Sequence, residues 1–140
     1  MIKIEQNNDE KAKKFVFEGI KKNNRKKCQW LREEEREYDY NFLVYDGDTL
    51  VGGAIGYVLF NWYFLDLLWL EKTYRGQDIG TNLIKRIEEH ALKENLTGVR
   101  METWNFQAKG FYEKLGYKVY ATIEDCPPGT INYFFMKRLK

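Results

Sequence analysis

The spacing of apolar side chains divides the chain into a helical first part, a middle part rich in strands, and a last part in which helices and strands alternate. Near the amino terminus, a polar run able to cap a helix precedes four apolar residues at helical spacing: Ala12, Phe15, Val16 and Ile20. Residues 21–37 are strongly charged, first basic and then acidic, which is typical of a solvated helix face. We therefore expect a capped helix followed by a charged segment.

From residue 39 onward, runs rich in apolar and β-branched residues follow one another. The runs 41–45 and 50–60 flank an Asp-Gly pair, which predicts a β-hairpin. A third run, 62–70, begins after a single residue, so we expect a meander of three antiparallel strands. The second and third runs are apolar at nearly every position, and this predicts strands covered on both faces.

A regular helix follows the meander. Apolar residues recur every four positions from Ile79 to Ala91, with charged side chains opposite them, so residues 79–94 are expected to pack one stripe against a sheet. Residues 99–104 are the next expected strand. A strand, a helix and a strand in this order predict a βαβ unit whose two strands are parallel.

The last part of the chain predicts a short helix and a hairpin. The helix, at about 107–115, ends at Gly116 in a left-handed cap, and the strands 117–123 and 131–139 flank a Pro-Pro-Gly turn. The elements predict an α/β fold of the mixed α+β kind. Its central mixed sheet is mostly antiparallel, with one parallel βαβ crossover and helices on both faces. With 140 residues, one domain over 1–140 is expected.

Composition narrows the functional classes. The charge sum is 23 − 21 = +2, so we expect no general attraction to nucleic acid or to an anionic membrane. No run approaches ~18 apolar residues, and the start lacks the features of a secretion signal, so we expect no membrane span and a cytoplasmic location. Cys28 and Cys126 are expected to be reduced thiols, and a single histidine, His90, argues against a zinc site.

One loop carries candidate chemistry. The segment Arg75-Gly76-Gln77-Asp78-Ile79-Gly80-Thr81 joins an expected buried strand to the start of the expected helix. Small residues there let backbone N–H groups face a ligand, the helix dipole favours an anion, and Arg75 can add a cation. The site therefore suits a phosphate or pyrophosphate, although such glycines also mark simple tight turns. The sequence contains no Gly-Lys-Ser/Thr tripeptide of a Walker loop, and the preceding strands do not fit a Rossmann fingerprint.

Together with this loop, the stretch 105–117 resembles the GNAT superfamily of acetyl-CoA-dependent N-acetyltransferases. The loop is similar to Arg/Gln-x-x-Gly-x-Gly/Ala, and the later block to Asn-x-x-Ala-x-x-x-Tyr-Glu-x-x-Gly-Phe/Tyr. The second block is matched at Asn105, Ala108, Tyr112, Glu113, Gly116 and Tyr117. The order of elements agrees over about residues 1–139. One departure is Asp78, which stands where the family has its first loop glycine. Asp tolerates the left-handed backbone and can cap the helix, but its charge opposes a pyrophosphate.

The resemblance implies an acetyl-CoA site. The backbone of Leu68 and Leu70 would meet the acetyl-pantetheine arm, the Leu70 N–H would bind the oxyanion, and the N–H groups from Arg75 to Thr81 would hold the pyrophosphate. Tyr112 is the candidate general acid for the leaving thiolate, with simple aromatic packing as its alternative role. Asn105 and Ala108 would contact the cofactor arm, although Asn105 could equally be a turn residue.

The sequence offers several candidates for the base that removes a proton from the amine. Asp66 interrupts the apolar run 62–70 and shares a face with Leu68 and Leu70, so its carboxylate is expected to be paired, to face a cavity or to have a raised pKa. A structural Asp is the other reading, and Glu71, Glu102 or a water relay are alternatives as the base. The aromatic residues that could line an acceptor cleft are Trp30, Tyr38 and Tyr40.

The expected function is acetyl transfer from acetyl-CoA to a primary amine of a small molecule or peptide, by direct attack on the thioester. One alternative is a catalytically weak CoA-binding regulatory module, which Asp78 favours. Another is an acetyltransferase associated with tRNA or other nucleic acid through the basic segment 21–27. The sequence does not name the acceptor amine. A homodimer could form through the apolar strand at 131–136.

Overall fold

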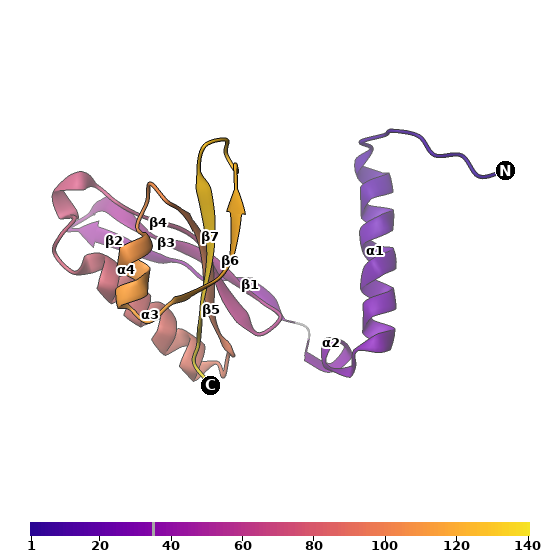
Figure 1. Cartoon of the computed structure of the whole chain (residues 1–140). Coiled ribbons are helices and arrows are strands. Elements are labelled where there is room, and N and C mark those ends of the chain that lie inside the picture. The colour runs from indigo at the N-terminus through magenta and orange to yellow at the C-terminus, as the bar shows by residue number, and fades with distance from the viewer. Residues whose placement is uncertain (35) are drawn as a thin grey trace. The chain divides into compact units, whose positions relative to one another are not determined.

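The structure is a computed structural model that describes residues 1–34 and 36–140. The chain divides into two compact units, Met1–Glu35 and Arg36–Lys140. The first contains α1 (Glu10–Lys27) and α2 (Gln29–Glu34), and the second contains the strands and the remaining helices (Figure 1). Among the described residues, no helix combines the length and the apolar character needed to cross a membrane.

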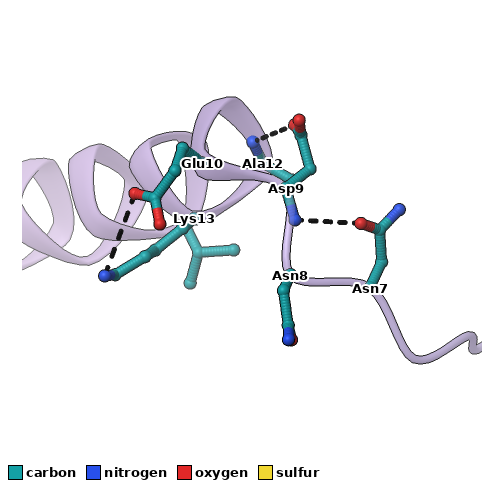
Figure 2. A pocket seen from close by; sticks show the side chains of 7 residues that line it. Asn7, Asn8, Asp9, Glu10, Ala12 and Lys13 are labelled. Atoms are coloured by element: carbon teal, nitrogen blue, oxygen red, sulfur yellow. Dashed lines mark hydrogen bonds and ion pairs between the residues drawn. The ribbon is translucent and has the colours of Figure 1, made fainter.

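The capped helix predicted near the amino terminus is confirmed. The Asp9 carboxylate accepts a hydrogen bond from the Ala12 N–H at 2.9 Å, and the Asn7 side chain accepts one from the Asp9 N–H at 2.9 Å (Figure 2). A hollow of about 530 Å³ beside this turn is lined by Asn7, Asn8, Asp9, Glu10, Ala12, Lys13 and Val16, none of which is a predicted site residue. No residue of α1 is buried, and Phe15 and Val16 are 81% and 68% exposed. The apolar side chains of α1 are therefore not packed into a core within their own unit.

The second unit is built on one seven-stranded sheet. Its strands are β1 (Glu37–Asp39), β2 (Phe42–Asp46), β3 (Thr49–Leu59), β4 (Trp62–Leu70), β5 (Gly98–Trp104), β6 (Lys118–Glu124) and β7 (Ile131–Arg138). Their order is β1-β3-β4-β5-β7-β6, and β2 also pairs with β3. Only β4 and β5 are parallel, joined through α3 (Ile79–Lys93), and all other pairs are antiparallel. The predicted meander and the predicted βαβ unit are therefore confirmed.

Two features of the strands differ from expectation. The short β1 was not predicted as a separate strand; it pairs with the far end of β3, beyond β2. Strand β7 lies between β5 and β6, so both of its edges are already hydrogen-bonded. The prediction that residues 131–136 pair with another subunit is therefore wrong, because an interior strand has no free edge. The strand at this edge of the sheet is β6, which pairs with β7 on one side only.

The core lies on one face of the sheet. Helix α3 buries Leu83, Ile84, Ile87 and Ala91 against the strands, and α4 (Lys109–Lys114) adds Tyr112 to the same cluster. On the opposite face, Leu67 and Trp69 of β4 are 60% and 54% exposed. Helices α3 and α4 therefore pack on one face of the sheet, and within residues 36–140 the other face of β4 is exposed, contrary to the expectation that this strand is covered on both faces.

The end of α4 is fixed by two kinds of contact. Gly116 has φ +90°, and the Tyr117 N–H donates to the Tyr112 carbonyl at 3.1 Å, which confirms the predicted left-handed cap. The Lys137 ammonium bonds the Glu88 carboxylate at 2.8 Å and the Leu115 carbonyl at 3.0 Å. These bonds tie α3, α4 and β7 together beside Tyr112, so the position of that side chain is held from several sides.

Candidate functional site

The parallel strands β4 and β5 separate partway along their length. Their pairing runs from Trp62 opposite Gly98 to Leu65 opposite Met101 and does not continue beyond this point. A cavity of about 510 Å³ lies where the strands diverge. It is lined by Leu65, Asp66, Leu67, Leu68, Met101, Glu102, Thr103, Trp104, Gln107, Ala108 and Tyr112. The sheet therefore opens at the carboxyl ends of two parallel strands, where ligands of open α/β sheets bind.

A β-bulge accounts for this opening. Leu65 pairs with Gly56 and Leu67 pairs with Ile55, so Asp66 is an extra residue on β4 with no partner on β3. A bulge bends its strand and increases the local twist. Because the bulge coincides with the last β4–β5 pair, it turns the end of β4 away from β5. The polar residue that interrupts the apolar run is thus the residue that opens the cleft.

The end of β4 presents its backbone to the cleft. The Glu71 N–H donates to the Val51 carbonyl at 2.9 Å, so Glu71 lies in a hydrogen-bonded pair with β3. In an antiparallel ladder such pairs alternate, and the peptide groups of Leu70 and Leu68 therefore point to the side that β5 has left. The Arg75 Nε–H donates to the Leu70 carbonyl at 2.9 Å. The Leu68 and Leu70 peptide groups named from the sequence thus point to the side that β5 has left, but of the two residues only Leu68 lines the cavity.

The loop before α3 leaves the helix N-terminus accessible. Asp78 is the N-cap residue, with φ +61° and ψ +11°, and its side chain makes no capping hydrogen bond. The left-handed backbone expected at Asp78 is confirmed, whereas the expected cap is wrong, because a left-handed N-cap turns the carboxylate away from the first turn. Gly76 has φ +76° with open space around it. The N–H groups of Ile79, Gly80 and Thr81 precede the first helical hydrogen bond, from the Asn82 N–H to the Asp78 carbonyl.

Tyr112 is a buried residue that lines the cavity. Its side chain is 7% exposed, and its ring contacts those of Phe111, Tyr117 and Phe135. Burial raises the pKa of Tyr112 to about 12, because the phenolate would lose its hydration. The hydroxyl therefore keeps its proton at neutral pH and can donate it within the cavity.

Two carboxylates lie at the cavity. Asp66 and Glu102 are exposed side chains on β4 and β5, and both line the cavity. Of the three environments expected for Asp66, the structure thus shows the one in which it faces a cavity. Glu102 also accepts a hydrogen bond from the Asn132 side chain at 3.2 Å. Glu71, the other alternative base, is not among the residues that line the cavity.

Among the remaining predicted site residues, one lines the cavity and the others do not. Ala108 lines the cavity, but Asn105 does not; its side chain accepts a hydrogen bond from the Ile131 N–H at 3.3 Å, as a turn residue would. Tyr40 stacks on His90 at 3.6 Å between ring centroids, and Tyr38 bonds the same imidazole at 3.1 Å. Neither tyrosine lines the cavity, and Trp30 belongs to the first unit.

Gln107 was not predicted as a site residue. Its side-chain oxygen accepts hydrogen bonds from the Thr103 hydroxyl at 3.1 Å and from the Trp104 N–H at 3.2 Å, and all three residues line the cavity. Thr103 is only 3% exposed. Gln107 thus closes the turn between β5 and α4. The sequence signal was a polar residue inside the block 105–117, three positions after a strand end.

Comparisons with known proteins agree with this geometry. The model of the acetyltransferase (GNAT) family matches residues 5–117. Blasticidin-S acetyltransferase of Streptomyces morookaense is 43% identical over 91 residues, which is 64% of this chain and 67% of that protein. The crystal structure of an acetyltransferase from Bacillus cereus superimposes with a TM-score of 0.89 at 25% identity and covers 98% of both chains. A streptothricin acetyltransferase from Bacillus anthracis, solved with acetyl coenzyme A, is similar in fold, with a TM-score of 0.66 at 18% identity over 73% of this chain and 64% of that one.

Proposed function

Because the chain belongs to the acetyltransferase (GNAT) family and transfers an acetyl group from acetyl-CoA to an amine, we propose that its acceptor is a small cationic molecule with a primary amine. The observation that carries this proposal is the pair of carboxylates, Asp66 and Glu102, at the cavity that Tyr112 also lines. Carboxylates attract an ammonium group, and several charges on one acceptor can be bound at once. A relative named for blasticidin S is consistent with this class of acceptor.

The residues of the cleft fit acetyl-CoA. The cleft-facing peptide groups of Leu68 and Leu70 would bind the pantetheine arm, and the accessible N–H groups of Ile79, Gly80 and Thr81 would bind the pyrophosphate. Gly76 and Gln77 would contribute the backbone before them. Acetyl-CoA supplies an activated acetyl group on a thiol that can leave.

We assign the protein groups the following roles. Asp66 accepts the proton of the acceptor ammonium, directly or through a water molecule, so that the neutral amine can attack. The Leu70 N–H donates to the carbonyl oxygen as negative charge develops on it. Tyr112, whose pKa is raised by burial, would then give its proton to the departing thiolate, and the tyrosinate would take the proton that the acylated nitrogen loses as it becomes an amide. Glu102 holds a cationic group of the acceptor.

A panel of amines tests the acceptor class. Thiol release from acetyl-CoA would be followed with blasticidin S, streptothricin, kanamycin, thialysine and spermidine, and with benzylamine as a singly charged, largely apolar control. We expect kcat/KM for the best polycationic acceptor to exceed that for benzylamine at least about tenfold, which corresponds to ~1.4 kcal/mol of differential binding. Equal values for benzylamine and every polycation would contradict the proposal.

The side chain at Asp78 is expected to weaken cofactor binding. Asp78→Gly removes a negative charge near the pyrophosphate and suits the left-handed backbone at φ +61°. We expect the Kd for acetyl-CoA, measured by calorimetry, to fall about two- to fivefold, in line with ~0.3–1 kcal/mol for a charge at a helix N-terminus. Asp78→Asn is the matched control, because it removes the charge but keeps a side chain. A Kd in Asp78→Gly that is unchanged or higher would show that the carboxylate does not oppose the cofactor.

Location and assembly are also part of the proposal. The two cysteines, Cys28 and Cys126, are exposed free thiols, which supports a reducing cytoplasm. A homodimer through β6 is supported by its place at the sheet edge and by three exposed apolar residues: Val119, Tyr120 and Ile123. Sedimentation velocity at micromolar concentration should then give the mass of a dimer, and a monomer would contradict this assembly.

The two alternative functions have less support. In the structure Asp78 adopts the left-handed conformation that the loop requires, so the loop forms despite the missing glycine. A weak regulatory module is therefore not favoured over an enzyme. The basic segment 21–27 belongs to the first unit and lies next to acidic residues in the sequence, which does not favour a nucleic-acid partner.

A further inference from the structure

Asn132 of β7 is one of the most deeply buried polar side chains of the second unit. It is 3% exposed, and its amide nitrogen donates a hydrogen bond to the Glu102 carboxylate at 3.2 Å. Its amide oxygen is buried and has no hydrogen-bond partner among the described residues. A half-satisfied buried amide lowers stability relative to an apolar side chain of the same size. The stability of the fold therefore does not account for an amide at this position.

The sheet register explains how Asn132 reaches Glu102. Asn132 lies opposite Trp104, and Glu102 lies opposite Phe134, so all four side chains are on the same face. Strand β7 is hydrogen-bonded on both sides, by β5 and β6. The Trp104 indole is itself held, because its N–H donates to the Cys126 carbonyl at 2.6 Å. Asn132 thus extends from an interior strand, whereas the carboxylate that it contacts is exposed.

We infer that Asn132 is a positioning residue for acceptor recognition: its amide holds the Glu102 carboxylate at the cavity, ready to bind the cationic acceptor. This inference rests on the proposed function of Glu102. An exposed glutamate samples several rotamers, and fixing one of them before the acceptor arrives reduces the entropy lost on binding. Asn132 acts through Glu102 and touches neither the acceptor nor the cofactor.

The test variant is Asn132→Leu, which keeps the branch at Cγ and the number of side-chain heavy atoms, adds some bulk, and removes both the donor and the unpartnered oxygen. We expect the KM for the best acceptor of the amine panel to rise about five- to twentyfold, with kcat and the KM for acetyl-CoA changing less than about twofold. The melting temperature should stay the same or rise. A fall in melting temperature together with a rise in both KM values would show that Asn132 is merely structural and would overturn the inference.

A double-mutant cycle with Glu102→Ala shows whether the two residues act together. If Asn132 acts through Glu102, Asn132→Leu will not raise the acceptor KM further once Glu102 is alanine. An equal rise in both backgrounds would overturn the inference. The cycle also separates the inference from the proposed function. If Glu102→Ala alone leaves the acceptor KM unchanged, Glu102 does not bind the acceptor and both fail; if it raises KM while Asn132→Leu does not, only the inference fails.

Discussion

Tyr112→Phe is expected to lower kcat by about 10²- to 10⁴-fold, the usual contribution of a general acid. Tyr112 lines the cavity, and burial raises the pKa of its hydroxyl to about 12, so it remains a proton donor at neutral pH. Phenylalanine keeps the ring and its contacts with Phe111, Tyr117 and Phe135, and the Kd for acetyl-CoA should change little. Steady-state kinetics and calorimetry would measure the two quantities.

Tyr117→Phe provides the matched control. Tyr117 is a second buried tyrosine of the same cluster, but its hydroxyl donates to the Glu88 carboxylate at 3.1 Å, and Tyr117 is not among the residues that line the cavity. Its loss should cost about 0.5–1.5 kcal/mol of stability and leave kcat within about twofold. If Tyr112→Phe likewise leaves kcat within twofold, Tyr112 is a packing residue and another group protonates the thiolate.

Gly56→Ala is expected to destabilise the protein by about 2–3 kcal/mol, as overpacking does in a rigid core. Gly56 pairs with Leu65 beside the bulge, and a Cβ there would lie 2.6 Å from the Phe64 carbonyl oxygen and collide with the ring of Tyr63. Tyr63 is fully buried, and its hydroxyl donates to the Tyr40 carbonyl, so the ring has little freedom to move. Urea denaturation would measure the loss.

Gly110→Ala is the control for this substitution. Gly110 lies in α4, and an added Cβ would meet no atom within 4 Å. Alanine should therefore be neutral or stabilise the helix by ~0.5–1 kcal/mol. A Gly56→Ala protein that is as stable as the wild type would mean that Tyr63 and the bulge can move apart, and the rigid opening of β4 from β5 would lose its support.

Local patterns predicted most of the elements because each depends on residues close in sequence. The stripe from Ile79 to Ala91 specifies α3, the Asp-Gly pair specifies the first hairpin, and Gly116 ends α4 in the left-handed conformation. The turn at Phe60 and Asn61 contains no glycine, yet both residues have positive φ, 50° and 66°. That turn was located only because two apolar runs lie on either side of it.

Features that depend on pairing between distant strands could not be predicted. The bulge at Asp66 follows from the register of β4 against Gly56 on β3, and the interior place of β7 follows from its pairing with β5. For the same reason the contact between Asn132 and Glu102, 30 positions apart, has no local signal. Of the site residues predicted from the family block, Ala108 and Tyr112 line the cavity, whereas Asn105 is hydrogen-bonded to Ile131 at the start of β7.

We propose that the peptide groups at the end of β4 and at the start of α3 bind the coenzyme. Titration of ¹⁵N-labelled protein with CoA, followed by amide NMR, tests it most directly, because each N–H group is observed separately. We expect large chemical-shift changes at Leu68, Leu70, Ile79, Gly80 and Thr81, with small changes along β6 at the far edge of the sheet. If CoA at millimolar concentration leaves these amides unshifted, or shifts only residues outside the cleft, the coenzyme does not bind between β4 and β5.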